Sequence, residues 1–151
     1  MLMNVLLALA ILLVVLAAFV ATRPGDFRIV RTRTVAAAPE VVHPFVNDFH
    51  NWPAWSPWEK IEGRMTIVDT RPPAGVTIRL EFLKPFKATN TTHFDLAPSG
   101  GGTHVSWAMT GPNGFMAKAL SLFMNMDKVV GSDFEKGLAG LDAATSPRPK
   151  V

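Results

Sequence analysis

The segment 83–141 most constrains the fold, because it joins a glycine turn, two alternating stretches and a long apolar periodicity. Gly100, Gly101 and Gly102 can take the positive φ that a tight hairpin needs, and the flanking residues alternate apolar with polar. Farther on, apolar residues three or four apart predict one helix of roughly seven turns. Its stripe comprises Phe115, Ala119, Leu122, Phe123, Met126, Val130, Phe134, Leu138 and Leu141. Neither layer can bury its apolar side alone, so we expect this helix to lie across the inner face of a sheet.

Alternation elsewhere in the chain predicts the rest of that sheet. Strands are predicted at 27–35, 62–70, 76–83, 88–96 and 103–110. A short helix is expected after Pro39, ending by about Phe49, because Pro44 is tolerated only near a helix start. The following "NWPAWSPW" predicts a compact irregular corner.

The N-terminus predicts a membrane-spanning helix. Residues 1–21 contain one polar side chain, Asn4, and no charge, and a helix of that length spans the roughly 30 Å of a bilayer core. The alternative is a cleaved signal peptide, whose apolar region is usually about 7–15 residues and follows a basic start. This run is longer and no Lys or Arg precedes it, which favours a retained anchor. The expected organisation is an anchor at 1–22, a linker at 23–26, a domain at 27–144 and a polar tail at 145–151.

Four arginines follow the apolar run: Arg23, Arg28, Arg31 and Arg33. By the positive-inside rule they place the domain on the cytoplasmic side of a single-pass membrane protein. They would also hold the domain close to anionic lipid. For the last three of them, a solvated strand face is an equal alternative.

The composition argues against several classes of function. The chain has no cysteine, which excludes thiolate chemistry and a disulfide scaffold. A net charge of +3 from scattered basic residues gives no nucleic-acid motif. The four histidines are dispersed, so no metal site is expected. We expect no cofactor and no catalytic residue, because no phosphate loop, nucleophile elbow or inward carboxylate pair is present.

The chain closely resembles the SRPBCC or START-like (Bet v 1-like) superfamily, in its polyketide cyclase/dehydrase branch. The resemblance covers about residues 24–141 and rests on "AAAPEVVHPFVNDFHNWPAWSPWEK", "GRMTIVDTRPP", "IRLEFLKPFKATNTTHFDL" and "GGTHVSWAMTGPNGFMAKALSLFMNMDKVVGSDFEKGL". It implies an α+β helix-grip fold, in which a curved antiparallel sheet wraps around a long C-terminal helix. A hydrophobic cavity lies between the sheet and the helix. Members of this branch often carry an N-terminal membrane helix.

The chain departs from this pattern between the tryptophan corner and "GRMTI". Two of the usual strands are absent there, since Lys60 runs almost directly into Gly63. Their absence would open one side of the cavity and expose a sheet edge. A partner strand could pair with that edge.

The resemblance and the apolar pattern together predict a cavity that binds a hydrophobic small molecule or lipid beside the membrane. The expected lining residues are Trp55, Trp58, Phe82, Phe94, Trp107, Met109, Phe115, Phe123, Met126 and Phe134. The alternative for these side chains is that they simply fill the core. The alternative function is a polyketide cyclase or dehydratase-like enzyme, which would need a titratable group inside the cavity.

Overall fold

The computed structural model describes residues 1–58, 62–84 and 87–146. The elements, in chain order, are α1 (Leu2–Ala21), β1 (Asp26–Val35), α2 (Pro39–Asn47), η1 (Phe49–Ala54), β2 (Gly63–Arg71), β3 (Gly75–Phe82), β4 (Ala88–Ser99), β5 (Gly102–Pro112), α3 (Phe115–Leu120) and α4 (Met126–Thr145). The five strands and the short helix after Pro39 form where the sequence predicts them. Most of the expected polar tail lies outside the described residues.

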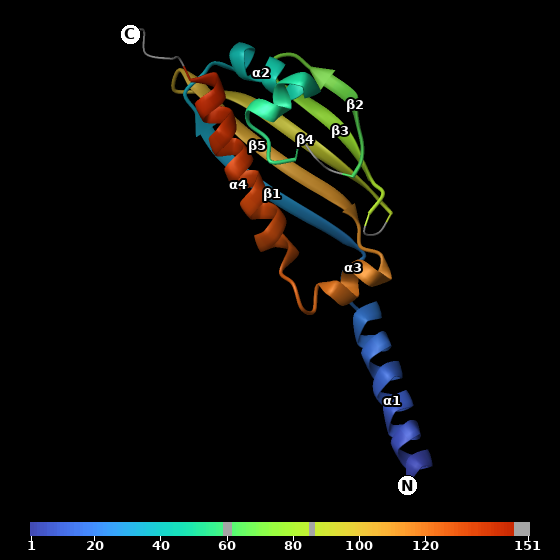
Figure 1. Ribbon diagram of the computed structural model, residues 1–151. Coiled ribbons are helices and arrows are strands. Elements are labelled where there is room, and N and C mark those ends of the chain that lie inside the picture. The colour runs from blue at the N-terminus through green and yellow to red at the C-terminus, as the bar shows by residue number, and fades with distance from the viewer. Residues whose placement is uncertain (59–61, 85–86, 147–151) are drawn as a thin grey trace.

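The strands form one curved antiparallel sheet in the order β1-β5-β4-β3-β2 (Figure 1). The β4–β5 hairpin turns at Gly100 and Gly101, whose φ angles are 55° and 84°. L side chains rarely adopt that region, so the predicted role of these glycines is confirmed. The helix α4 crosses the concave side of the sheet next to β1. This arrangement is the expected helix-grip fold.

The core lies between the sheet and its helical cover. Alternate residues of β3, β4 and β5 are buried. The helix α2 lies over these three strands, and α4 reaches β5 through Phe134, which stacks on Trp107. The largest fully buried side chains are Trp52, Trp107, Phe94, Phe134, Ile78, Leu80, Leu138, Leu141, Val35, Val42, Val46 and Val76. The predicted inner faces of these three strands are therefore confirmed, and so is the C-terminal half of the helical stripe.

The N-terminal half of that stripe was predicted wrongly, because the single expected helix is two helices. The first of them, α3, ends at Leu120. Asn125 then caps α4 by accepting a hydrogen bond from the Lys128 backbone N–H at 3.0 Å. Asn favours such a cap because its short side chain satisfies a backbone donor that a helix start leaves free. As a result Phe115 and Phe123, expected to face the sheet, are 55% and 85% exposed.

The first helix projects from the domain (Figure 1). Val20 is its one buried residue. Among the described residues α1 is the one helix long and apolar enough to cross a membrane. It contacts α3, at the end of the domain where β1 begins.

The strand β2 is an edge of the sheet, as the missing segment predicts. Its pairing with β3 shifts between Ile67 and Asp69, so that Val68 bulges out of the ladder. A bulge and charged side chains are the usual means of blunting an edge. Arg64, Asp69 and Arg71 supply such charges here.

Candidate ligand-binding site

A cavity of about 430 Å³ lies between the inner face of the sheet and the α3–α4 region. Its described lining comes from β1, β3, β4, β5, both helices and the corner after η1. The lining residues are Phe27, Ile29, Trp58, Phe82, Lys84, Ala88, Asn90, Met109, Pro112, Asn113, Ala117, Leu120, Ser121, Met126 and Val130. Most are apolar, so the cavity suits a hydrophobic guest of small-molecule size.

A larger hollow of about 510 Å³ lies on the opposite, outer face of the sheet. Its lining includes Arg28, Thr89, Thr91 and Thr110, which point to solvent by the strand alternation. No element covers that face in the described part of the chain. We therefore place the candidate site in the inner cavity, which is smaller but walled by both layers.

Asn90 is the buried polar group of the inner cavity. It is 7% exposed, and its Nδ2 faces the Met109 sulfur at 3.9 Å, a weak contact. Its Oδ1 has no hydrogen-bond partner among the described residues. A buried amide with an unused hydrogen-bonding group is costly in a protein interior. Depending on which way the amide is turned, it offers a ligand an acceptor or a donor.

The other polar lining residues already have partners. The ammonium of Lys84 pairs with Glu62 at 3.0 Å, and both side chains are exposed. The hydroxyl of Ser121 donates to the Lys118 carbonyl at 2.6 Å. The Asn113 amide donates to the Pro24 carbonyl at 3.4 Å. Asn90 is thus the interior group best able to select a ligand.

The structure divides the ten residues predicted to line a cavity into three groups. Trp58, Phe82, Met109 and Met126 line it. Trp55, Phe94, Trp107 and Phe134 are buried in the core instead. Phe115 and Phe123 are on the surface because of the helix break. Ligand binding by any of them stays a prediction.

The tryptophan corner explains why the second group packs in the core and does not line the cavity. The indole N–H of Trp52 donates to the Val46 carbonyl at 3.1 Å, and that of Trp55 to the Phe45 carbonyl at 2.9 Å. Both rings meet Trp107 edge-on, at centroid distances of 6.4 Å and 5.7 Å. These two tryptophans belong to the core. For Trp55 this is the alternative that the sequence left open. Of the three tryptophans in this corner, Trp58 is the one that also lines the cavity.

Arg31 fixes the start of α4 beside the cavity. Its guanidinium donates to the Asp127 carboxylate at 2.9 Å and to Glu135 at 2.8 Å. These hydrogen bonds lower the pKa of Asp127 and raise that of Arg31. Gly131 lies against the guanidinium, where a Cβ would overlap it. Arg31 therefore faces the helix, and its side chain is 23% exposed. Arg33 pairs with Asp142 of the same helix at 3.3 Å and stays 46% exposed, which agrees with the solvated-face alternative.

The histidines lie away from the cavity. His43 contacts the Thr70 hydroxyl at 3.2 Å, and His93 contacts Thr77 at the same distance. His50 is exposed, and hydrogen bonds from its backbone N–H and ring lower the pKa of Asp48. Within the described ranges no three His, Asp or Glu side chains form a metal-binding group.

The fold and the cavity together define a helix-grip domain with an apolar pocket. No protein-family model matches the chain. No curated protein matches it either. Solved structures match it in fold, however. The chain is similar to protein MLL2253 from Mesorhizobium loti, with 13% identity and a TM-score of 0.63 over 78% of this chain and 96% of that one.

Two further solved structures are similar. Protein CV1439 from Chromobacterium violaceum is 16% identical, with a TM-score of 0.61 over 83% of this chain and all of that one. An AHSA1-like protein from Rhizobium etli is also 16% identical, with a TM-score of 0.58 over 85% of this chain and 88% of that one. At these identities the likeness shows the shared fold alone.

Proposed function

We propose that the protein is a membrane-anchored SRPBCC-type domain that binds a hydrophobic small molecule or lipid in the inner cavity. The observation that carries the proposal is the apolar cavity of about 430 Å³ at the end of the domain that α1 joins. Burial of apolar ligand surface provides about 25 cal/mol per Å². A ligand that buries about 200 Å² would therefore gain about 5 kcal/mol before the cost of association.

The lining favours binding over the cyclase or dehydratase-like alternative. Among the described lining residues Lys84 is the one titratable group, and it is 75% exposed and paired with Glu62. Acid–base catalysis needs a titratable group close to the reacting atoms, with a pKa tuned by its surroundings. The proposed role is therefore to hold or shield a ligand without covalent chemistry.

A photoactivatable fatty acid tests this proposal on the full-length protein in lipid nanodiscs. Crosslinks to α1 would report only the bilayer, whereas crosslinks to β4 and β5 peptides would report the cavity. We expect Ala88→Phe, which fills the cavity, to abolish the β5 crosslinks and leave those of α1. Ala97→Phe, on the exposed outer side of the same strand, is the matched control. Absence of β4 and β5 crosslinks in the unmodified protein would refute the proposal.

The retained anchor and its orientation form a second part of the proposal. Arg23 and Arg28 follow α1 and favour a cytoplasmic domain. Because the chain has no cysteine, Ser99→Cys provides a single labelling site on the domain. In intact cells a membrane-impermeant maleimide should fail to label it until the membrane is permeabilised. Labelling in intact cells would place the domain outside, and a protein lacking residues 1–21 in the soluble fraction would mean that α1 is cleaved.

A further inference from the structure

Large apolar side chains gather on the surface around α3. In the described chain after α1, ten large apolar residues are exposed, and seven of these lie between residues 115 and 129. We call six of them the apolar rim: Phe115, Met116, Leu120, Phe123, Met124 and Met126. Phe123 is the most exposed at 85%. Clusters of exposed apolar side chains are typical of surfaces that contact a membrane or another protein.

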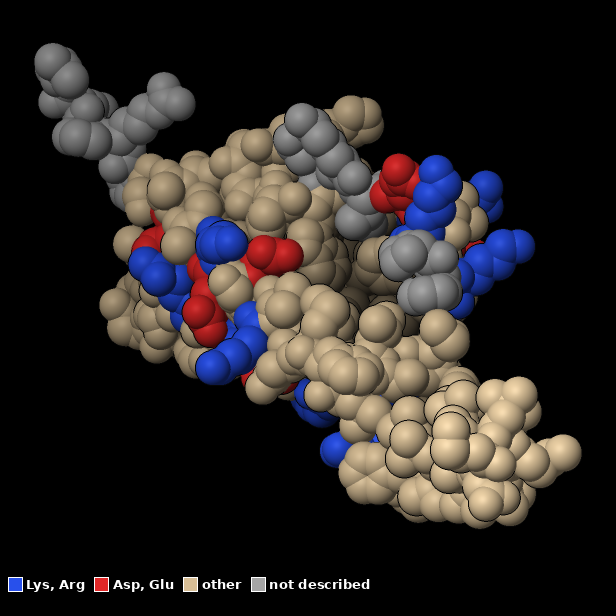
Figure 2. All heavy atoms as spheres, turned by 60° about the horizontal axis from the view of Figure 1, so that its bottom comes forward, with Lys and Arg blue, Asp and Glu red and all other residues tan. Residues whose placement is uncertain are grey.

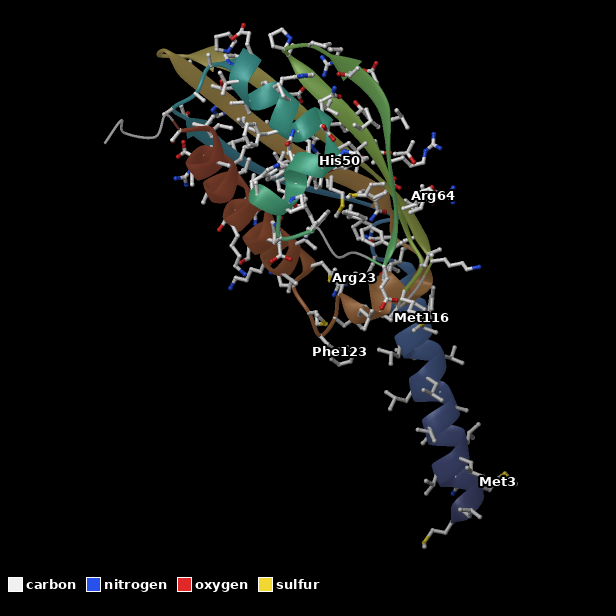
Figure 3. The ribbon with its side chains drawn as sticks, turned by 45° about the horizontal axis from the view of Figure 1, so that its top comes forward. Met3, Arg23, His50, Arg64, Met116 and Phe123 are labelled. Carbon is white, nitrogen blue, oxygen red and sulfur yellow. The ribbon has the colours of Figure 1, made fainter. Side chains whose placement is uncertain are left out.

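The apolar rim lies next to the end of α1. The helices α1 and α3 are in contact. Figure 2 shows the uncharged surface of α1 continuing onto the adjoining end of the domain. In Figure 3, Met116 and Phe123 lie at this end, and Phe123 points away from the sheet. A helix of 20 residues spans a bilayer core of roughly 30 Å, so the end of a membrane-spanning α1 would bring the rim to the lipid headgroups.

The charges near the apolar rim fit an anionic lipid surface. Residues 112–126 contain Lys118 and no Asp or Glu. Lys128 follows in the first turn of α4, while Asp127 beside it is paired with Arg31. On the α1 side, the guanidinium of Arg23 lies 5.0 Å from the ring centroid of Phe19. Basic side chains around exposed apolar ones are typical of segments that lie in the interface of anionic membranes.

The apolar rim is also a wall of the cavity. Leu120 and Met126 belong to both, and Ala117 and Ser121 line the cavity from the same segment. The rim therefore separates the cavity from the region that the bilayer would occupy. A ligand leaving the lipid would pass α3 to reach Met109 and Asn90.

We propose that the apolar rim inserts into the lipid interface beside α1, and that the ligand enters the cavity directly from the bilayer. The inference rests on the proposed binding function and on a retained anchor. A lipid surface accounts for the rim, its basic border and its position beside α1 together. A second copy of the chain would account for the exposed apolar residues alone.

The insertion of the apolar rim is tested by its depth in a membrane. The full-length variant Phe123→Cys carries an environment-sensitive fluorophore in vesicles of phosphatidylcholine with or without phosphatidylglycerol. We expect lipids spin-labelled near the headgroup to quench this fluorophore, more strongly when phosphatidylglycerol is present. The control is Ser99→Cys, at the hairpin that lies at the far end of β5. A water-exposed fluorophore at residue 123 would overturn the proposal, and so would shielding that disappears when the protein is diluted among the vesicles, since that outcome indicates a second copy.

Entry from the bilayer is tested by the rate of cavity loading. The double variant Met116→Glu with Phe123→Glu should slow the appearance of β5 crosslinks to a photoactivatable fatty acid by roughly tenfold, because charged side chains oppose insertion. Val41→Glu with Val68→Glu changes two exposed apolar residues elsewhere and is the matched control. An unchanged rate would overturn bilayer entry. Absence of β5 crosslinks in the unmodified protein would instead refute the binding function, while the depth measurement still decides the insertion.

Discussion

Trp107 of β5 and Phe134 of α4 stack face to face, with ring centroids 4.2 Å apart and an angle of 9° between the rings. Both side chains are fully buried. The Trp107 indole N–H donates to the Thr92 hydroxyl at 3.0 Å, and that hydroxyl donates to the Ala108 carbonyl at 2.9 Å. The pair therefore joins the two layers of the fold and leaves no polar atom of the indole unsatisfied.

Replacing Trp107 with Ala should lower the free energy of unfolding by about 3–5 kcal/mol, the usual cost of removing a buried aromatic side chain. Chemical denaturation of the full-length protein in detergent measures this change. Phe123→Ala is the matched control, and it should stay within about 0.5 kcal/mol because Phe123 is on the surface. A near-neutral Trp107→Ala would show that β5 does not face α4.

Gly137→Ala should destabilise the protein although alanine favours helices. A Cβ at residue 137 would lie 2.6 Å from the Trp107 ring, so α4 or the ring must move. Overpacking of this kind costs about 1–3 kcal/mol, which exceeds the gain of about 1 kcal/mol from helix propensity. Gly25→Ala, where a Cβ meets nothing within 4 Å, serves as the control in thermal unfolding. An increase in stability for Gly137→Ala would contradict the close approach of α4 to the sheet.

The sequence could predict the sheet because its signal is local. Each strand alternates, so inward residues such as Val76, Phe94 and Val105 follow from their positions alone. The interruption of the helix at Asn125 depends on a different kind of signal. The apolar spacing on both sides of it fits one helix, and only the competition between a continuous helix and the Asn125 cap decides against it. Apolar periodicity does not measure that competition.

The sequence predicted the candidate site less well than the sheet, in part because of this interruption between α3 and α4. Met126 lines the cavity, but Phe123 does not, because the turn between α3 and α4 redirects its side chain. Asn90 was missed since only apolar residues were considered as lining. Its position was nonetheless readable, because it shares the inner face of β4 with Phe94 at an even spacing. A polar residue at an inward strand position is the signal that would have found it.

The ion pair between Arg31 and Asp127 should make the start of α4 sensitive to acid. The Arg31 hydrogen bond holds the pKa of Asp127 below its usual value of about 3.9. A carboxyl whose pKa is lower in the folded state stabilises the protein above the unfolded pKa and loses that contribution as the pH falls through the folded pKa. The stability difference between the protein and Asp127→Asn should thus be largest near neutral pH, begin to fall at about pH 4 and vanish only when the pH is below the folded pKa of Asp127.

Denaturation at a series of pH values measures that difference. Asp133→Asn is the control, because among the described residues this carboxylate pairs with Lys136, one turn along the same helix. The stability difference caused by Asp127→Asn should weaken with added salt, because the Asp127 side chain is exposed and salt screens its ion pair. A difference that grows as the pH falls would contradict the assigned pairing.

Deleting Val68 should promote association between chains. The deletion would restore a regular ladder, since Ile67 already pairs with Ile78 and Asp69 with Thr77. A regular exposed edge is a template for another strand. We expect the unmodified protein to be monomeric in detergent and the deletion variant to form dimers or larger species by light scattering. Val68→Ala, which keeps the bulge, should stay monomeric. A monomeric deletion variant would show that the charged residues of β2 suffice to protect the edge.

Asn90 and Thr92 lie on the same inner face of β4, yet their replacement should have opposite effects. Thr92→Val removes the acceptor of the Trp107 indole and should cost about 1–3 kcal/mol, since a buried donor is left unpaired. Asn90→Leu removes an amide whose Oδ1 has no partner among the described residues, so it should be neutral or stabilise the empty protein by about 1 kcal/mol. The same change should weaken binding of any ligand that hydrogen-bonds to the amide. Denaturation of both variants, with the fatty-acid crosslinking of Asn90→Leu, separates the two roles: a large loss of stability in Asn90→Leu would mean that the amide holds the fold rather than the ligand.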